Sequence, residues 1–262
     1  MPCGKSHAKE ADKIFEPYSI LEKFDLFRLN PKYKNINLEK ALSTYIPHEL
    51  KIEDLQRKAL SVSFQLFNPE EGNWGPEILD NLEPGCPDGK TTAIDAILRS
   101  SAAPTFFPSY QGYVDGGVVA NNPSMVALSR AIDQKKGKKK IGKTFLLSIG
   151  TGLSHNAILK DIAWGATPWV LNPFAKAPTP ANPLLSVFME GAADISHYQC
   201  TQILGEKYFR FDPFLDKGIE LDDWKNVTYL IEEAKALPYK DPEGWKDLVK
   251  WVRKNFKKEK IQ

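Results

Sequence analysis

Residues 113–123 read YVDGGVVANNP, and the fold is best approached from this stretch. Tyr113–Asp115 has the pattern of a short strand, which Gly116-Gly117 breaks. Asn122 is a favourable N-cap and Pro123 suits the first helical position, where its missing N–H costs nothing. The stretch therefore predicts a strand, a tight turn and a helix. Asp-Gly alone is a common turn signal, so the neighbouring elements decide what the stretch means.

Strand and helix patterns alternate on both sides of this stretch. Residues 60–67 alternate apolar with small or polar side chains, and the apolar run 143–149 has the length of a strand. We expect Gly150-Thr151-Gly152 to form a turn rather than a phosphate-binding loop, and residues 69–90 to form a loop. The other expected elements are a strand over 207–211 and helices over 37–42 with Asn37 as N-cap, 91–100, from 122 onward, 184–204, 224–236 and 242–258. This alternation predicts an α/β fold with a mostly parallel central sheet.

The composition excludes several classes of protein. The 262 residues are 42% hydrophobic and 26% charged, with 35 Lys and Arg against 33 Asp and Glu, as in an ordinary globular chain. No apolar run approaches the roughly 20 residues of a membrane-spanning helix. The three cysteines are scattered, which argues against a disulfide framework or a cysteine metal site, and no apolar leader is evident at the N-terminus. We expect a cytoplasmic protein.

The order of several motifs is more specific than any one of them. Residues 99–108 (RSSAAPTFFP) precede 113–123, and Ser148–Gly152, Ala193-Asp194 and residues 208–211 follow. In this order the motifs resemble the patatin-like phospholipase family, over roughly residues 60–213. The resemblance implies a three-layer α/β/α sandwich that hydrolyses lipid esters with a serine–aspartate dyad, without a cofactor or a metal.

The resemblance assigns the aspartate of the dyad to Asp115. A carboxylate with a pKa of about 3.9 is a weak base, so burial has to raise its pKa before it can take a proton from serine. We expect Gly116 and Gly117 to clear space beside the carboxylate and to permit φ > 0. Asn121 and Asn122 complete the motif. The side chains expected to bury Asp115 are Val114, Val118 and Val119.

The other half of the dyad is missing from the expected pattern. The nucleophile of the family lies in a G-x-S-x-G turn between a strand and a helix, and the nearest match that we identify is residues 4–8, GKSHA. This match lacks the last glycine and no strand pattern precedes it, so we do not expect Ser6 to be a nucleophile. We expect an N-terminally incomplete patatin-like domain over 1–213, lacking its first strands, with a helical extension over 214–262.

Two interpretations of function remain open. The chain is either the C-terminal portion of an acyl hydrolase, inactive alone, or a non-catalytic pseudoenzyme or half-domain that binds lipid or a partner chain. If the chain takes part in catalysis, a partner chain or an upstream segment supplies the nucleophile.

The C-terminal segment 245–262 combines an apolar stripe with basic residues. Residues 246–260 hold seven basic and two acidic side chains, and such a helix either lies on an anionic membrane or packs its stripe on the domain. We expect packing, and keep peripheral membrane contact as the alternative. The lysine run 135–140 lacks interleaved aromatic residues, so we expect no nucleic-acid binding.

Overall fold

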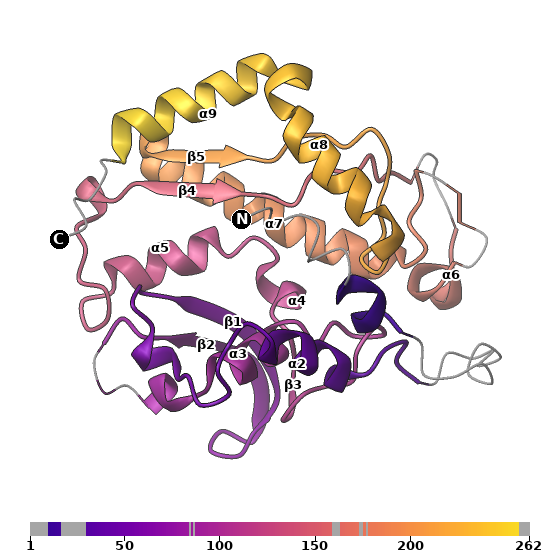
Figure 1. Cartoon of the computed structure of the whole chain (residues 1–262), viewed down its shortest axis with the longest axis horizontal. Coiled ribbons are helices and arrows are strands. Elements are labelled where there is room, and N and C mark those ends of the chain that lie inside the picture. Colours follow the sequence, from indigo (N-terminus) through magenta and orange to yellow (C-terminus); the bar gives the residue numbers. More distant parts are fainter. Residues whose placement is uncertain are drawn as a thin grey trace. The chain divides into compact units, whose positions relative to one another are not determined.

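The computed structural model describes residues 10–16, 30–83, 85, 87–158, 163–172, 175–176 and 178–256. The chain divides into two compact units, Met1–Lys138 and Lys139–Gln262 (Figure 1). Each unit combines helices with a β-sheet, which confirms the α/β class. The expected boundary between 213 and 214 came from the extent of the family resemblance, and it stays a prediction.

The first unit is built on three antiparallel strands in the order β2-β1-β3. The central strand β1 (Leu60–Asn68) pairs with β2 (Asn73–Asp80) on one side and with β3 (Tyr113–Asp115) on the other. The expected loop over 69–90 is therefore wrong in part, because it contains β2. The four residues between β1 and β2 allow only an antiparallel hairpin, so the expectation of a mostly parallel sheet fails in this unit.

Of the helices α2, α3, α4 and α5 in the first unit, α3 begins at a residue whose side chain caps it. α3 (Ala93–Ser100) has Thr92 as N-cap, whose Oγ1 accepts from Asp95 N at 3.1 Å. It buries Ile94, Ala96 and Leu98 and packs against β1 and β3 (Figure 1). α2 (Asn35–Ser43) begins earlier than expected, with Lys34 and not Asn37 at the N-cap position. The other elements are α4 (Gly117–Ala120), α5 (Ser124–Ile132) and the 3₁₀ turns η2 (Ile52–Asp54) and η3 (Pro87–Lys90).

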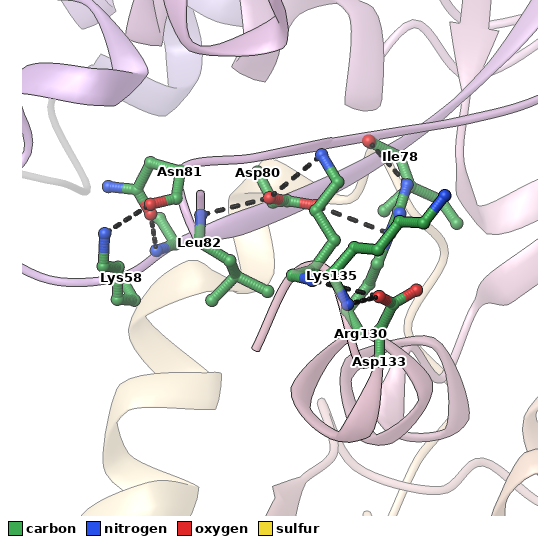
Figure 2. A network of polar contacts seen from close by, with 10 residues as sticks. Lys58, Ile78, Asp80, Asn81, Leu82, Arg130, Asp133 and Lys135 are labelled. Atoms are coloured by element: carbon green, nitrogen blue, oxygen red, sulfur yellow. Dashed lines mark hydrogen bonds and ion pairs between the residues drawn. The ribbon is translucent and has the colours of Figure 1, made fainter. Parts of the chain in front are cut away.

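A buried carboxylate ties the end of β2 to α5 (Figure 2). Asp80 is 0% exposed, and its Oδ2 lies 3.4 Å from Arg130 Nε while its Oδ1 lies 3.9 Å from Lys136 Nζ. Oδ1 also accepts from Leu82 N at 3.1 Å. A charge taken out of water is tolerated only when it is paired, so these two cations hold Asp80 in the interior.

The second unit contains a parallel pair of strands, as expected for this part of the chain. β4 (Leu146–Ile149) pairs in register with β5 (Tyr208–Phe211), and the long helix α7 (Pro183–Leu204) precedes β5. α7 matches the expected helix to within one residue. The remaining elements are α6 (Ala166–Val170), α8 (Val227–Lys240), α9 (Pro242–Asn255) and the 3₁₀ turns η4 (Ile141–Lys143), η5 (Gly205–Lys207) and η6 (Trp224–Asn226).

The Gly150-Thr151-Gly152 stretch is a turn wrapped around a side chain of the protein. A Cβ on Gly150 would lie 2.0 Å from Cγ of Asp212, and Gly152 N donates to Asp212 Oδ1 at 2.9 Å. Arg210 forms an ion pair with the same carboxylate. Asp212 therefore takes the place that an anion would need, which confirms the expected turn.

The aromatic residues of α9 pack against β5. The ring centroids of Trp251 and Phe209 lie 5.7 Å apart, and those of Trp245 and Phe211 lie 6.2 Å apart. Trp251 Nε1 also donates to Glu206 O at 2.9 Å. The described part of the C-terminal segment thus packs its apolar stripe on the unit, as expected. None of the described helices combines the length and the apolar character needed to cross a bilayer.

Candidate functional site

Asp115 is the last residue of β3, and its backbone is fixed on both sides. Asp115 N donates to Ala102 O at 3.0 Å, and Asp115 lies opposite Ser63 in the β1–β3 register. A tight turn precedes β3, in which Tyr110 and Tyr113 exchange two backbone hydrogen bonds of 2.9 Å. Backbone hydrogen bonds therefore fix the end of β3 in place.

The two glycines after Asp115 act through close approach and not through positive φ. A Cβ on Gly116 would lie 2.1 Å from the carbonyl oxygen of Val62, so only glycine fits where the chain crosses β1. Gly116 has φ −64°, and the expected φ > 0 is wrong, because the turn continues directly into α4 in helical geometry. Gly117, the first residue of α4, donates its N–H to Asp115 Oδ1 at 2.6 Å.

The Asp115 carboxyl is largely withdrawn from water. Burial raises its pKa above the usual value, and the hydrogen bond from the Gly117 N–H partly offsets this rise. A raised pKa is the change that makes a carboxylate a better base near neutral pH. The direction agrees with the sequence-based expectation, although the surrounding side chains differ from those expected.

An open pocket of about 270 Å³ leads to Asp115. Its lining residues are Leu60, Ser61, Val62, Ser100, Asp115, Gly116, Gly117, Ala120, Asn121 and Pro123. None of the three valines expected to bury Asp115 lines it, and Val119 is 39% exposed. Val118 and Val119 belong to α4, which turns them away, and Val114 precedes Asp115 in β3, where successive side chains point to opposite faces. Strand β1 and Pro123 supply the apolar wall instead.

The structure brings Asp115, Gly116, Gly117 and Asn121 to one pocket and gives Asn122 a different position. Asn122 is 2% exposed, and its Oδ1 accepts from Ser124 N at 3.2 Å and from Ser124 Oγ at 2.6 Å. Its side chain accepts from the first N–H of α5, but the structure places Pro123 and not Asn122 at the N-cap position, so the predicted helix start is wrong by one residue.

Sequence reasoning missed two hydroxyl groups of the pocket, those of Ser61 and Ser100. Ser100 lies within the stretch that carries the family resemblance, and that stretch was the only signal for it. Ser61 belongs to β1, and the alternation of its strand says only which face it occupies. Its place beside Asp115 depends on strand pairing.

The candidate nucleophile positions give no elbow in the described chain. Ser6 lies outside the described residues. A second near match, Gly152-Leu153-Ser154-His155-Asn156, also lacks the last glycine, and the described residues that follow it directly, 155–158, are not helical. An elbow needs a helix immediately after the serine. Within the described chain, no three His, Cys, Asp or Glu side chains are grouped closely enough to hold a metal ion.

The fold and the pocket define a class of protein: an α/β protein with a partly buried carboxylate at the end of a strand, open to a small pocket with hydroxyl groups. Comparison with known proteins identifies one family. The family model for patatin-like phospholipase matches residues 5–128. The chain is 31% identical over 234 residues to Protein teg of Priestia megaterium, covering 81% of this chain and 72% of that protein.

Two further relatives are named as a putative hydrolase and as a phospholipase. The putative sporulation hydrolase CotR of Bacillus subtilis is 30% identical over 234 residues, again covering 81% of this chain and 72% of the relative. The 85/88 kDa calcium-independent phospholipase A2 of Rattus norvegicus is 24% identical over 254 residues, covering 81% of this chain and 31% of the relative. This chain belongs to the patatin-like phospholipase family, and its relatives support a lipid-hydrolase function.

Proposed function

We propose that this chain supplies the base half of a lipid acyl hydrolase, with Asp115 as the residue that takes the proton of a serine nucleophile. One observation carries the proposal: Asp115 is a largely buried carboxylate, hydrogen-bonded at one oxygen by Gly117 N, at an open pocket. Relatives named as a phospholipase and as a putative hydrolase support the same chemistry.

The proposed reaction uses Asp115 twice. As a serine Oγ attacks the ester carbonyl carbon, its proton moves to the Asp115 carboxylate. The carbon–oxygen bond to the leaving alcohol then breaks, and the alkoxide takes that proton. In the second half, Asp115 accepts a proton from water, whose oxygen attacks the acyl-serine carbonyl, and the serine leaves with the proton. The products are one alcohol and one carboxylic acid.

The proposed reaction needs a serine nucleophile from outside these 262 residues. Residues 1–262 contain no G-x-S-x-G stretch. We therefore propose that an upstream segment or a partner chain supplies the serine, and that the 262 residues alone are inactive.

The test compares two proteins on short-chain nitrophenyl esters and on phospholipid vesicles: the 262-residue chain, and the same chain extended through the codons upstream of Met1. We expect no turnover above the blank from the first and hydrolysis from the second. Asp115→Asn in the extended protein is expected to lower kcat by at least about a hundredfold. Asp115-dependent turnover by the 262 residues alone would show that they hold their own nucleophile. Full activity of the extended Asp115→Asn protein would refute the role of Asp115.

A second candidate function is a non-catalytic module that binds a partner chain. One face of α7 favours it, because five large apolar side chains there are 37–62% exposed: Leu184, Val187, Phe188, Ile195 and Tyr198. Exposed apolar patches of this kind often mark interfaces. The upstream reading frame discriminates the candidates, since an encoded elbow favours the enzyme and its absence favours the module.

Peripheral membrane contact through residues 245–262 remains a proposal. The aromatic side chains of α9 are engaged with β5, so any contact has to use the exposed basic side chains, such as Lys246 and Lys250. Flotation with phosphatidylserine vesicles tests this. The Lys246→Glu/Lys250→Glu double variant is expected to bind at least tenfold more weakly, because each basic residue near an anionic surface contributes about 1 kcal/mol. The matched control is Lys138→Glu/Lys139→Glu, and equal flotation of both double variants would contradict the proposal.

The cytoplasmic location and the absence of nucleic-acid binding stay predictions from the sequence.

A further inference from the structure

Ser63 is a buried hydroxyl in the row of side chains that includes Asp115. It lies in the middle strand β1, and its partners in register are Glu77 in β2 and Asp115 in β3. Directly opposite residues of antiparallel strands point to the same face, with Cβ atoms about 4.5–5.5 Å apart. Two carboxyl groups therefore flank the Ser63 hydroxyl, one on each side.

The hydroxyl of Ser63 is out of reach of solvent and unsatisfied. Ser63 is 1% exposed, and among the described residues its Oγ has no hydrogen-bond partner. The same face lies under α3, since Ser61 Oγ donates to Ala96 O at 3.5 Å. Leaving a buried hydroxyl unpaired is unfavourable. A neighbouring carboxyl group that becomes ionised would offer this hydroxyl an acceptor.

Of the two flanking carboxyl groups, only Glu77 has a cation beside it in the described part of the chain. Its Oε2 is 3.8 Å from Arg99 NH1. The ionised form of Asp115 is disfavoured by burial, and the Gly117 N–H is the hydrogen bond that counters it. A rotation about χ1 moves a serine hydroxyl among three staggered positions at little cost.

We propose that Ser63 is a positioning residue whose hydroxyl donates a hydrogen bond to the carboxylate of Asp115 when that carboxylate is ionised. This inference rests on the proposed function for its meaning, since it gives the base a second donor and a fixed orientation. Substrate need not touch Ser63, which lies behind the carboxylate in the sheet.

The charged and titratable groups near the pair come from three elements. β2 contributes Glu77, β3 contributes Tyr113, and α3 contributes Asp95 and also Arg99, whose Cζ lies 4.4 Å from the Tyr113 ring centroid. Asp95 accepts from Tyr110 Oη at 2.8 Å and from Thr92 Oγ1 at 2.8 Å. Helix α4, directly after Asp115, contains only Gly, Val and Ala. A change in the Ser63 hydroxyl can therefore be followed at two carboxyl groups, Asp115 and Glu77.

The experiment follows the side-chain carboxyl carbons of ¹³C-labelled protein by NMR as a function of pH. The Asp115 signal is assigned with Asp115→Asn and the Glu77 signal with Glu77→Gln. In Ser63→Ala, we expect the titration midpoint of Asp115 to rise by about one pH unit, since the ionised form loses a hydrogen bond. Ser63→Thr keeps a hydroxyl and should stay within a few tenths of the wild type. Ser101→Ala is the matched control, because Ser101 Oγ already donates to Ile97 O at 2.6 Å.

An unchanged Asp115 midpoint in folded Ser63→Ala would overturn the proposal, and so would a shift confined to Glu77. Should Ser63→Ala fail to fold, Ser63→Cys replaces the hydroxyl with a weaker donor of similar shape, and its Asp115 midpoint should also rise. The readout needs no substrate. Absence of ester hydrolysis in the extended protein would refute the proposed function and leave this test unaffected.

Discussion

Asp115 Oδ1 accepts a hydrogen bond of 2.6 Å from the backbone N–H of Gly117, two residues further along the chain. The bond forms because Gly116 lets the chain pass directly over the carbonyl of Val62 and turn into α4. The candidate base is thus oriented by the glycines that follow it in the sequence.

Gly116→Ala is expected to destabilise the first unit strongly. The new Cβ would lie 2.1 Å from Val62 O, so β1 and the start of α4 would have to separate. Overpacking against backbone costs about 3 kcal/mol or more. Urea unfolding followed by circular dichroism measures the change. Gly75→Ala is the control in the same sheet, where nothing lies within 4 Å of the added Cβ, and equal losses in both variants would contradict the argument.

Asp115→Asn is expected to stabilise the folded chain near neutral pH. Burial raises the pKa of Asp115 in the folded state above its unfolded value, so the carboxyl favours folding fully only below the unfolded pKa. This contribution is lost as pH rises through the folded pKa, by about 1.4 kcal/mol for each pH unit between the two values. The neutral amide removes that loss. Urea midpoints of both proteins at pH 3.5 and pH 7.5 measure it, and a gain of equal size at both pH values would argue against a raised pKa.

Asp95→Asn is expected to lower the pKa of Tyr110. Burial, followed by the hydrogen bond to Asp95 and its charge, raises the pKa of Tyr110 from 10.0 to about 12. Removing the charge leaves burial in place, so the pKa should fall but stay above 10.0. Ultraviolet difference titration reports tyrosinate formation, with Tyr110→Phe identifying the signal. A pKa unchanged in Asp95→Asn would show that burial alone sets it.

Arg130→Gln is expected to cost about 3 kcal/mol of stability, because it removes the nearer of the two described cations beside the fully buried Asp80 and leaves the more distant Lys136. Arg253→Gln on the exposed side of α9 is the charge-matched control and should change stability by less than about 0.5 kcal/mol. Chemical denaturation compares the two. Restoring stability in Arg130→Gln by adding Asp80→Asn would identify the unpaired charge as the cause, whereas a further loss would exclude it.

Elements with strong local signals could be predicted from the sequence. α7 agrees with its expected range because no proline interrupts the 22 residues that begin with Pro183, and α3 follows from its apolar periodicity and the Thr92 cap. β2 could not be predicted, because Gly75 and Pro76 make it look like a loop. It is a strand because β1 pairs with it continuously from Gly75 to Asp80 and again at Asn73, and an edge position tolerates a proline.

For the site, the motif around Asp115 identified the residue but not its surroundings. The valines next to it in sequence turn away, while Ser61 and Ser100, distant in sequence, line the pocket. Neighbours in sequence were the wrong guide, because Val114 lies on the opposite face of β3 from Asp115, while Val118 and Val119 belong to the helix that follows the strand.

The sequence by itself determined the family, the strands and helices with strong local signals, and the residue most suited to act as base. The tertiary structure alone decided what surrounds that residue: the carbonyl of Val62 against Gly116, the buried hydroxyl of Ser63 opposite Asp115, and the Asp212 carboxylate inside the glycine turn of the second unit. The physical reason is that local propensity sets which segments become strands and helices, whereas the register of pairing between distant segments sets which side chains meet.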